Sequence, residues 1–485
     1  MAESIKKKAV KGMLWSLIQR FSNVGIQFIS GIILARLLTP SDYGAIGMLL
    51  IFMTVAQAFM DCGFGAALIQ RKHPTQEDYS TIFWWNICMS LVLYGIMYVI
   101  SPIVANFYHM PILCKVLRVQ SLVLIISAIS LIQHNQLRKN LCFKKITIVN
   151  LIASVISLSV TIYMAYHGYG IWSLVAQNLL MSLIPAFIYW TTNNWFPSLC
   201  FSMKSLKSLF SFGVFVFLTN LISGICDNIQ GLLIGRFFSA SVMGFYAKAR
   251  STERIASLSI SEALRQVIFP LYSELQDDKT ALVNLIKLLT RLVSFVIFPF
   301  MFLLILLAKP IFLLLYSDRW LESVPFFQAL CLLGLSGCLQ SINTQTIAAI
   351  GKSKSMFKWT LVKRLIGLCV VLVGLVLGGI WGMIVGTVLQ GWFSYFINIA
   401  LVSKYVGYKF NHQLMDILPT LILSVVCFSL TFITAKFIDS EMYINAIAAF
   451  VQFLSMYILL AYVFKMEAFI ILINKVKARG FLVKK

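Results

Sequence analysis

A charged segment lies inside an otherwise apolar stretch of the chain, at residues 243–272. Three arginines and two serines in this segment, Arg250, Arg254, Ser257, Ser261 and Arg265, follow the spacing i, i+4, i+7, i+11, i+15. That spacing places all five on one face of an α-helix. A guanidinium group binds two phosphate oxygens at once, and the serine hydroxyls can bond to other hydroxyls. The pattern therefore predicts a surface for a phosphorylated, hydroxyl-rich ligand.

Other polar side chains inside apolar runs belong to the same prediction. A charge at the middle of a membrane-spanning helix costs about 2.5–3.5 kcal/mol on insertion scales, so it needs a wet cavity, a partner or a function. Arg20 is the N-terminal counterpart of the arginine face, although its position also allows the side chain to reach back to the membrane surface. Amides can contact sugar hydroxyls or bridge helices. The predicted substrate-binding residues are Arg20, Arg250, Arg254, Arg265, Lys248, Gln136 and Gln345.

Three acids within the apolar runs are candidates for ion coupling: Asp61, Glu253 and Glu262. A carboxylate there could titrate or bind a cation during transport. Structural alternatives exist for each. Glu253 with Arg254, and Glu262 with its neighbour Arg265, could be ion pairs that only hold the helix, and Asp61 could pair with an arginine or cap a bent helix end.

The composition indicates which kind of fold positions these residues. Hydrophobic residues make up 60% of the 485 residues and charged residues only 12%, whereas a soluble domain has about 25% charged residues. A spanning helix needs about 20 apolar residues. Fourteen such runs predict an all-α integral membrane protein with about 14 transmembrane helices, at residues 13–38, 44–67, 81–107, 112–136, 146–167, 170–190, 209–236, 243–272, 281–308, 322–349, 355–378, 380–403, 414–436 and 443–465.

A repeated motif indicates an internal duplication. Residues Leu34–Gly44 and Ile234–Gly244 each carry an arginine that ends an apolar run and a glycine eight positions later that opens the next. A second repeat, Gly170-Ile171-Trp172 and Gly379-Ile380-Trp381, lies 209 residues apart. In the first motif, Thr39 is placed to cap the following helix. We therefore expect two pseudo-symmetric six-helix lobes around a central cavity, each beginning with a helical hairpin.

The duplication also predicts the domain boundaries. Residues 1–190 form the first lobe and 209–403 the second, joined by a cytoplasmic linker at 191–208, and residues 404–485 add two further helices and a basic tail. Transporters built from two such repeats hold their substrate near the membrane midplane and work by alternating access. We expect the same of this chain.

The net charge of +23 follows the membrane topology. Lysine and arginine gather in alternate loops and at both ends, so the positive-inside rule places both termini in the cytoplasm. This distribution predicts contact with anionic membrane lipids and no binding of nucleic acid. Ten scattered cysteines show no metal-ligand spacing, and no catalytic or cofactor motif is found. The sequence thus favours a transporter without metal or cofactor over an enzyme.

Four segments resemble a known family: Leu34–Gly44, Asp61–Arg71, Leu233–Arg236 and Val267–Ser273. Together they are similar to bacterial polysaccharide flippases of the multidrug/oligosaccharidyl-lipid/polysaccharide exporter superfamily, in the branch of the colanic-acid and teichuronic-acid exporters. One position departs from the family pattern. Relatives often carry an aspartate six residues before the second arginine of the repeat, where this chain has Gln230.

The resemblance implies a function. It predicts a flippase that moves polyprenyl-diphosphate-linked oligosaccharide repeat units across the bacterial inner membrane, for assembly of O-antigen, capsule or exopolysaccharide. A polysaccharide polymerase and chain-length machinery would be its partners. Three alternatives remain: a drug antiporter of the same superfamily, a flippase for the peptidoglycan precursor, and an integral-membrane polysaccharide polymerase or ligase.

Overall fold

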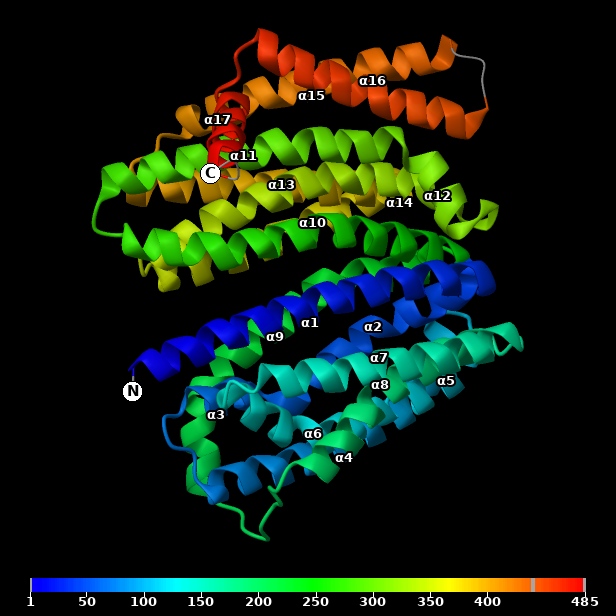
Figure 1. The fold of residues 1–485 in the computed structure, drawn as a ribbon. Coiled ribbons are helices and arrows are strands. Elements are labelled where there is room, and N and C mark those ends of the chain that lie inside the picture. Colours follow the sequence, from blue (N-terminus) through cyan, green and yellow to red (C-terminus); the bar gives the residue numbers. More distant parts are fainter. Residues whose placement is uncertain (1, 438–440, 483–485) are drawn as a thin grey trace. The chain divides into compact units, whose positions relative to one another are not determined.

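A computed structural model describes residues 2–437 and 441–482; within them, the side chains at 2–14, 16, 17, 20, 258–260, 262, 263, 265–267, 269, 270, 353, 354 and 475–482 lie outside the description. The described chain folds into seventeen α-helices and one short 3-10 helix, and these residues contain no strand. The helices form two compact units, residues 1–247 and 248–485 (Figure 1).

The first unit holds nine helices and the start of a tenth. Figure 1 draws α1 and α7 side by side and shows α3 as a short helix between α2 and α4. The helices are α1 (Ala2–Leu37), α2 (Pro40–Asp61), α3 (Phe64–Gln70), α4 (Gln76–Phe107), α5 (Ile112–Gln120), α6 (Leu122–Lys139), α7 (Phe143–Tyr166), α8 (Ile171–Thr192) and α9 (Met203–Phe237).

The second unit begins within α10. In Figure 1 its last long helices, α15 and α16, lie side by side, and α17 follows them and packs near α11. The elements are α10 (Ala240–Glu274), α11 (Lys279–Leu306), α12 (Ala308–Tyr316), η1 (Asp318–Trp320), α13 (Ser323–Ala349), α14 (Ser353–Val406), α15 (Phe410–Phe437), α16 (Met442–Val463) and α17 (Glu467–Leu482).

The number of membrane-spanning helices agrees with the prediction. Eleven described helices are long and apolar enough to cross a membrane. One of these, α14, contains two helices, because Gly378 and Gly379 interrupt it with non-helical backbone angles. The 36-residue α1 and the charged 35-residue α10 bring the total to fourteen. The all-α membrane fold with about fourteen spanning helices is confirmed.

Two predicted spans are not continuous helices. The span predicted at 44–67 ends at Asp61, because Cys62 and Gly63 adopt left-handed backbone angles with φ of 45° and 75°, and α3 begins at Phe64. The span predicted at 112–136 is divided at Ser121 into α5 and α6. Apolar composition extends through both breaks, so hydropathy alone predicts one helix at each place.

The first copy of the repeated motif forms the predicted hairpin. Thr39 ends the turn between α1 and α2 and caps α2 through a capping box. Its hydroxyl oxygen accepts the Asp42 backbone N–H at 3.3 Å, and its own backbone N–H donates to the Asp42 carboxylate at 2.9 Å. These bonds satisfy donors that a helix start leaves unpaired. The local interpretation of the motif as a helical hairpin is confirmed.

The two copies of the motif also pack against each other. A Cβ atom on Gly44 would overlap the carbonyl oxygen of Ala240, and one on Gly244 would overlap the carbonyl oxygen of Pro40. Only glycine leaves room for so close a backbone approach. We call this reciprocal contact, between the starts of α2 and α10, the glycine seam. It explains why each copy of the motif ends in glycine.

The opposite end of α2 is packed against α9 in the same manner. A Cβ on Gly63 would overlap the carbonyl of Gly213, and one on Gly213 would lie 2.9 Å from the carbonyl oxygen of Cys62. Helix α9 thus belongs to the compact unit of residues 1–247. The lobe boundary predicted at 191–208 stays a prediction. The boundary between the two compact units lies between residues 247 and 248, within α10.

Candidate functional site

Helix α10 carries charged side chains of very different exposure. Arg254 is exposed and Arg250 is half-buried. Glu253 and Lys248, in contrast, are buried, and each is only 3% exposed. Successive residues of a helix project about 100° apart, so Glu253 is turned into the protein and Arg254 out of it. The two side chains form no ion pair within 4.0 Å among the described residues, so this geometry does not favour the alternative of a Glu253–Arg254 pair that only holds the helix.

The predicted arginine–serine face is divided by the packing. Ser257 and Ser261 are 7% and 9% exposed. Ser261 donates a hydrogen bond to the sulfur of Cys338 at 3.4 Å, and the Cys338 thiol donates to the Ser257 carbonyl at 3.6 Å. The Ser261 side chain and the Ser257 backbone thus contact α13, both serines are buried, and the expected continuous wet face is interrupted there. The side chains of Arg265, Glu262 and Arg20 lie outside the described residues.

Glu253 is buried against two neighbouring helices. An added Cβ on Gly334 of α13 would lie 2.7 Å from its carboxylate oxygen and 3.1 Å from the terminal carbon of Met301 on α11. Gly334 thus makes the space that the carboxylate fills. A buried carboxylate is costly in the membrane, and Glu253 therefore stays a candidate for a functional role.

Lys248 is enclosed by aromatic rings. Its Nζ lies 4.0 Å from the centroid of the Tyr316 ring and 5.6 Å from that of Trp320. The Tyr316 hydroxyl is hydrogen-bonded to the Thr252 hydroxyl at 3.0 Å, one turn further along α10. A lysine over aromatic faces gains cation–π stabilisation when it is desolvated. In this structure Lys248 therefore holds α12 and η1 against α10 and has little contact with solvent.

The remaining predicted residues lie apart from α10 in the sequence. Gln136 on α6 and Gln345 on α13 are both half-buried, one in each unit. The Asp61 carboxylate accepts the Gly65 N–H at 3.0 Å, within the break between α2 and α3. Arg71, the nearest arginine to Asp61 in the sequence, pairs at 3.0 Å with the buried Asp78. For Asp61, this geometry favours the structural alternative.

Sequence inspection missed the role of Asp78. The Asp78 carboxylate closes a capping box with Thr75 at the start of α4 and accepts a hydrogen bond from the Ser205 hydroxyl of α9. The signal was present, because Thr75-x-x-Asp78 repeats the spacing of Thr39-x-x-Asp42. The same motif at two helix starts could have identified this acid as structural.

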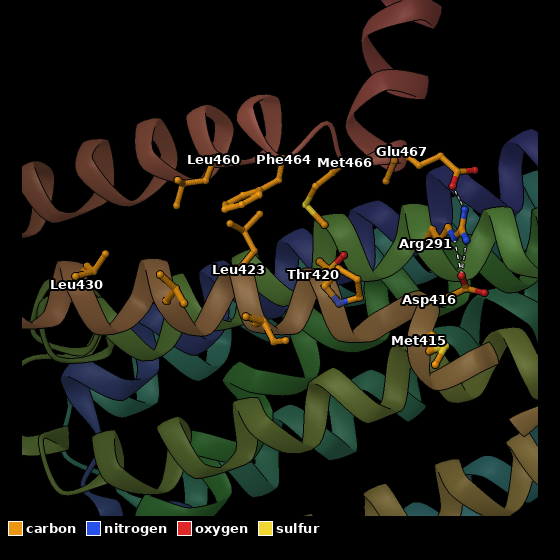
Figure 2. A pocket seen from close by; sticks show the side chains of 14 residues that line it. Arg291, Met415, Asp416, Thr420, Leu423, Leu430, Leu460, Phe464, Met466 and Glu467 are labelled. Carbon is orange, nitrogen blue, oxygen red and sulfur yellow. Dashed lines mark hydrogen bonds and ion pairs between the residues drawn. The ribbon is translucent and has the colours of Figure 1, made fainter. Parts of the chain in front are cut away.

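The second unit contains an elongated, mostly apolar cavity of about 650 Å³ between α15 and the helices α16 and α17. Figure 2 shows Leu423, Leu430, Leu460 and Phe464 along its length. At one end the cavity changes character. Arg291 reaches it from α11, and Asp416 and Glu467 come from α15 and α17 (Figure 2).

These three charged residues form an ion network. The Arg291 guanidinium donates to the Asp416 carboxylate through Nε at 2.7 Å and through a terminal nitrogen at 2.6 Å, and it also pairs with Glu467. The Tyr408 hydroxyl, in the turn before α15, donates to the other oxygen of Asp416. Burial and the adjacent Asp416 carboxylate raise the pKa of Tyr408 well above its usual range. The phenol therefore stays a donor.

A smaller cavity of about 260 Å³ lies in the first unit, between α2, the α5–α6 junction and α8. Its lining includes three amide side chains, Gln57, Gln120 and Asn178, on an otherwise largely apolar wall. None of these three residues was singled out in the sequence. Among the described side chains, no group of three His, Cys, Asp or Glu could hold a metal ion.

Eleven described helices are long and apolar enough to cross a membrane, the long helix α10 carries a buried acid and an exposed arginine, and cavities lie between helices. These are features of a polytopic membrane transporter. Residues 33–325 match the model of the family described as "Polysaccharide biosynthesis protein". This match spans more than half of the chain, and the protein belongs to that family.

Relatives and solved structures are consistent with this assignment. The chain is 26% identical to teichuronic acid biosynthesis protein TuaB of Bacillus subtilis, covering 73% of this chain and 74% of TuaB. It is 23% identical to lipopolysaccharide biosynthesis protein WzxC of Escherichia coli, covering 87% and 88%. Succinoglycan biosynthesis transport protein ExoT of Rhizobium meliloti is 25% identical, with 75% and 74% covered.

Two solved structures share the fold. The lipid II flippase MurJ, in an inward closed conformation, superposes with a TM-score of 0.77 at 16% identity, covering 93% of this chain and 98% of MurJ. A multidrug resistance MATE family transporter, in an inward-facing conformation, gives a TM-score of 0.61 at 14% identity, covering 80% and 94%. The fold of this chain is thus shared with these two membrane proteins.

Proposed function

We propose that this protein is a flippase that moves polyprenyl-diphosphate-linked oligosaccharide repeat units across the bacterial inner membrane, for assembly of O-antigen, capsule or exopolysaccharide. The observation that carries the proposal is an exposed Arg254 beside a half-buried Arg250 on the membrane-spanning α10. Membership in a polysaccharide biosynthesis family and the names of the relatives support it. Polysaccharide polymerase and chain-length machinery would act on the exported units.

The diphosphate of this cargo needs positive charge along its path. It cannot cross hydrocarbon unaided, and arginine binds phosphate oxygens bidentately where lysine acts only as a point charge. Arg20, Arg250, Arg254 and Arg265 would supply that charge. Lys248 would join them only in a conformation in which the Tyr316–Trp320 segment has moved away. The amides of Gln136 and Gln345 would contact sugar hydroxyls.

The polyprenyl tail needs an apolar path at the side of the protein. The 650 Å³ cavity between α15, α16 and α17 has the required character, because leucine and phenylalanine side chains line most of its length. Its charged end is neutralised within the protein by the Arg291 network. This arrangement supports a role for the two C-terminal spanning helices in holding the tail while the headgroup crosses.

Transport by alternating access needs a moving interface and an energy source. Rocking of the two predicted lobes would part α2 from α9 and α10 at the glycine seam or at its opposite end, near Gly63 and Gly213. Of the acids predicted for ion coupling, Asp61, Glu253 and Glu262, the geometry supports Glu253 best. It is buried in the second unit, and its carboxylate fills the space left by Gly334.

The proposed orientation places both termini in the cytoplasm. A cysteine introduced near Asp42, in a predicted outer turn, should react with a membrane-impermeant thiol reagent added to intact cells. A cysteine at Lys144 should react only after the membrane is opened. External labelling at Lys144 would contradict the orientation, which follows from the placement of basic loops.

The test of the transport mechanism is the substitution of Arg254. Loss of one charge-assisted contact of about 1.5–3 kcal/mol should reduce transport by Arg254→Ala about 10- to 100-fold. Arg254→Lys keeps the charge but not the bidentate geometry, so it should be impaired as well. Flipping of a fluorescent undecaprenyl-diphosphate oligosaccharide is measured in proteoliposomes, with equal protein levels confirmed.

Two controls make this test specific. Arg319→Ala removes another exposed arginine, located in the turn after α12, and should leave transport unchanged. The double variant Glu253→Gln/Arg254→Ala addresses the alternative that Arg254 only balances its neighbour. Since the two side chains do not pair, the double variant should be at least as inactive as Arg254→Ala. Recovery of transport in the double variant would remove the case for phosphate binding by Arg254.

A further inference from the structure

The cavity between α2, the α5–α6 junction and α8 is unusual for the middle of a spanning bundle. All three helical segments that line it belong to candidate membrane spans. Polar groups at that depth are costly unless they face water, pair with each other or serve a ligand. The cavity nonetheless collects three carboxamides, those of Gln57, Gln120 and Asn178, and the hydroxyls of Thr54 and Ser182.

Gln120 is the most informative of these residues. It is only 7% exposed, and its side-chain oxygen has no hydrogen-bond partner among the described residues. An amide oxygen left unpaired in an apolar surrounding costs free energy, so buried polar atoms in folded proteins nearly always have a protein, water or ligand partner. The oxygen itself is covered by protein atoms, but Gln120 lines the cavity, so a turn of its amide brings an unpaired polar atom to a guest there.

The neighbouring side chains leave the cavity amides available. The Thr54 hydroxyl donates to the Leu50 carbonyl at 2.7 Å, and the Ser182 hydroxyl donates to the Asn178 carbonyl at 3.3 Å. Each hydroxyl oxygen can still accept a bond. No described residue bonds to the side-chain amides of Gln57 or Asn178. The cavity therefore offers both donors and acceptors to a guest.

The surrounding packing holds this wall in place. Gln177, next to Asn178 on α8, donates to the Ser30 hydroxyl of α1 at 3.2 Å, which ties α8 to α1. On the other side, a Cβ on Gly224 of α9 would lie 2.7 Å from the methyl group of Thr54. The methyl group of Thr54 thus packs directly against the backbone of α9 at Gly224. Helix packing thus holds this part of α8 and the Thr54 side chain in place.

The chemistry of the lining identifies the guest. None of the lining residues is charged, so the cavity does not suit a phosphate or a cation. Amides donate and accept at once, which matches the hydroxyls of a sugar. Buried Leu49, Met53 and Val123 give an apolar surface on which the C–H face of a sugar ring can lie. A volume of about 260 Å³ equals that of roughly eight or nine waters at ~30 Å³ each.

We infer that this cavity is a sugar pocket that takes one ring of the lipid-linked glycan, with the amides of Gln57, Gln120 and Asn178 bonded to its hydroxyls. The inference deepens the proposed flippase function and rests on it. The pocket is open at its rim, where Gln57 and Met181 are exposed, so a ring can enter while the rest of the glycan stays outside. It separates sugar recognition from diphosphate recognition by the arginines.

The test compares two lipids on the full chain in nanodiscs. One is undecaprenyl diphosphate without sugar, and the other carries a single glucose, galactose or N-acetylglucosamine. Binding is measured by native mass spectrometry, and the readout is the ratio of the two affinities. Wild type should prefer at least one glycosylated lipid. Gln120→Leu and Asn178→Leu should lower that ratio about five- to tenfold each and leave undecaprenyl diphosphate binding unchanged.

Gln70→Leu is the matched control, because Gln70 is an exposed glutamine at the end of α3, outside the cavity. It should keep the wild-type ratio. An unchanged ratio in both cavity variants would overturn the inference and leave a water-filled cavity, and so would a ratio of one for wild type with every sugar. If wild type binds neither class of lipid, the proposed flippase function fails first, and the sugar pocket fails with it.

Discussion

The ion network at the end of the larger cavity gives a quantitative prediction about stability. The perturbation is Asp416→Asn, which removes the charge but keeps the shape of the side chain. The Asp416 side chain is 5% exposed and that of Arg291 21%. Breaking a buried ion pair by neutralising one partner costs about 3–5 kcal/mol. Arg291 is partly hydrated and keeps Glu467 as a partner, so we expect about 2–3 kcal/mol here.

Glu467 provides the contrast within the same network. Its side chain is 62% exposed, and exposed ion pairs contribute less than about 1 kcal/mol. Glu467→Gln should therefore cost less than half as much as Asp416→Asn. Added salt should reduce the effect of Glu467→Gln further, because screening acts on exposed charges, and should change that of Asp416→Asn little.

Thermal unfolding in detergent, followed by tryptophan fluorescence, measures the difference. The second unit contains 238 residues, and for this size 1 kcal/mol shifts the midpoint by about 2–4 °C. Asp416→Asn should thus lower the midpoint by about 4–12 °C and Glu467→Gln by less than about 4 °C. The double variant Arg291→Met/Asp416→Leu replaces the pair by apolar side chains and should recover part of the loss. Equal effects of the two single variants would refute the burial argument.

Two glycine positions give further predictions. Gly244→Ala places a methyl group on the Pro40 carbonyl and should open the glycine seam, measured as faster labelling of a cysteine introduced at position 239. Gly334→Ala drives a methyl group into the Glu253 carboxylate and should lower both the unfolding temperature and transport. Its control is Gly337→Ala on the same helix, where nothing lies within 4 Å, and where alanine should stabilise by up to about 1 kcal/mol. Equal effects at the two α13 positions would contradict the packing of Glu253.

Much of the fold could be predicted from the sequence, since each spanning helix is encoded locally by its own apolar run. The break at Gly378 and Gly379 was predicted as well, because these two glycines separate the apolar runs 355–378 and 380–403. The break after Asp61 was not, because it depends on the packing of Gly63 against Gly213, 150 residues away. A run of apolar residues has no local sign of such a contact.

The candidate site was predicted less completely. Charged residues of α10 stand out in an apolar run, and their position on one long helix was predicted correctly. Which of them are buried was not, because exposure depends on α11, α12 and α13. The partners Arg291, Asp416 and Glu467 lie on three different helices, and the amides of the smaller cavity come from three others. Spacing within one helix carries no information about such assemblies.

The atoms that make up the glycine seam determine under which conditions it could open and close. Its two halves are backbone: a Cα–H group of each glycine faces a carbonyl of the other copy. Contacts of this type are weak individually. They involve no titratable group and no side chain that loses rotamer entropy when the contact forms. Opening and closing at the seam would therefore depend little on pH, carry no side-chain entropy cost at these contacts, and release no charge that water must solvate. In the proposed transport cycle, the seam would meet the same backbone surface each time it closed, whatever the cargo.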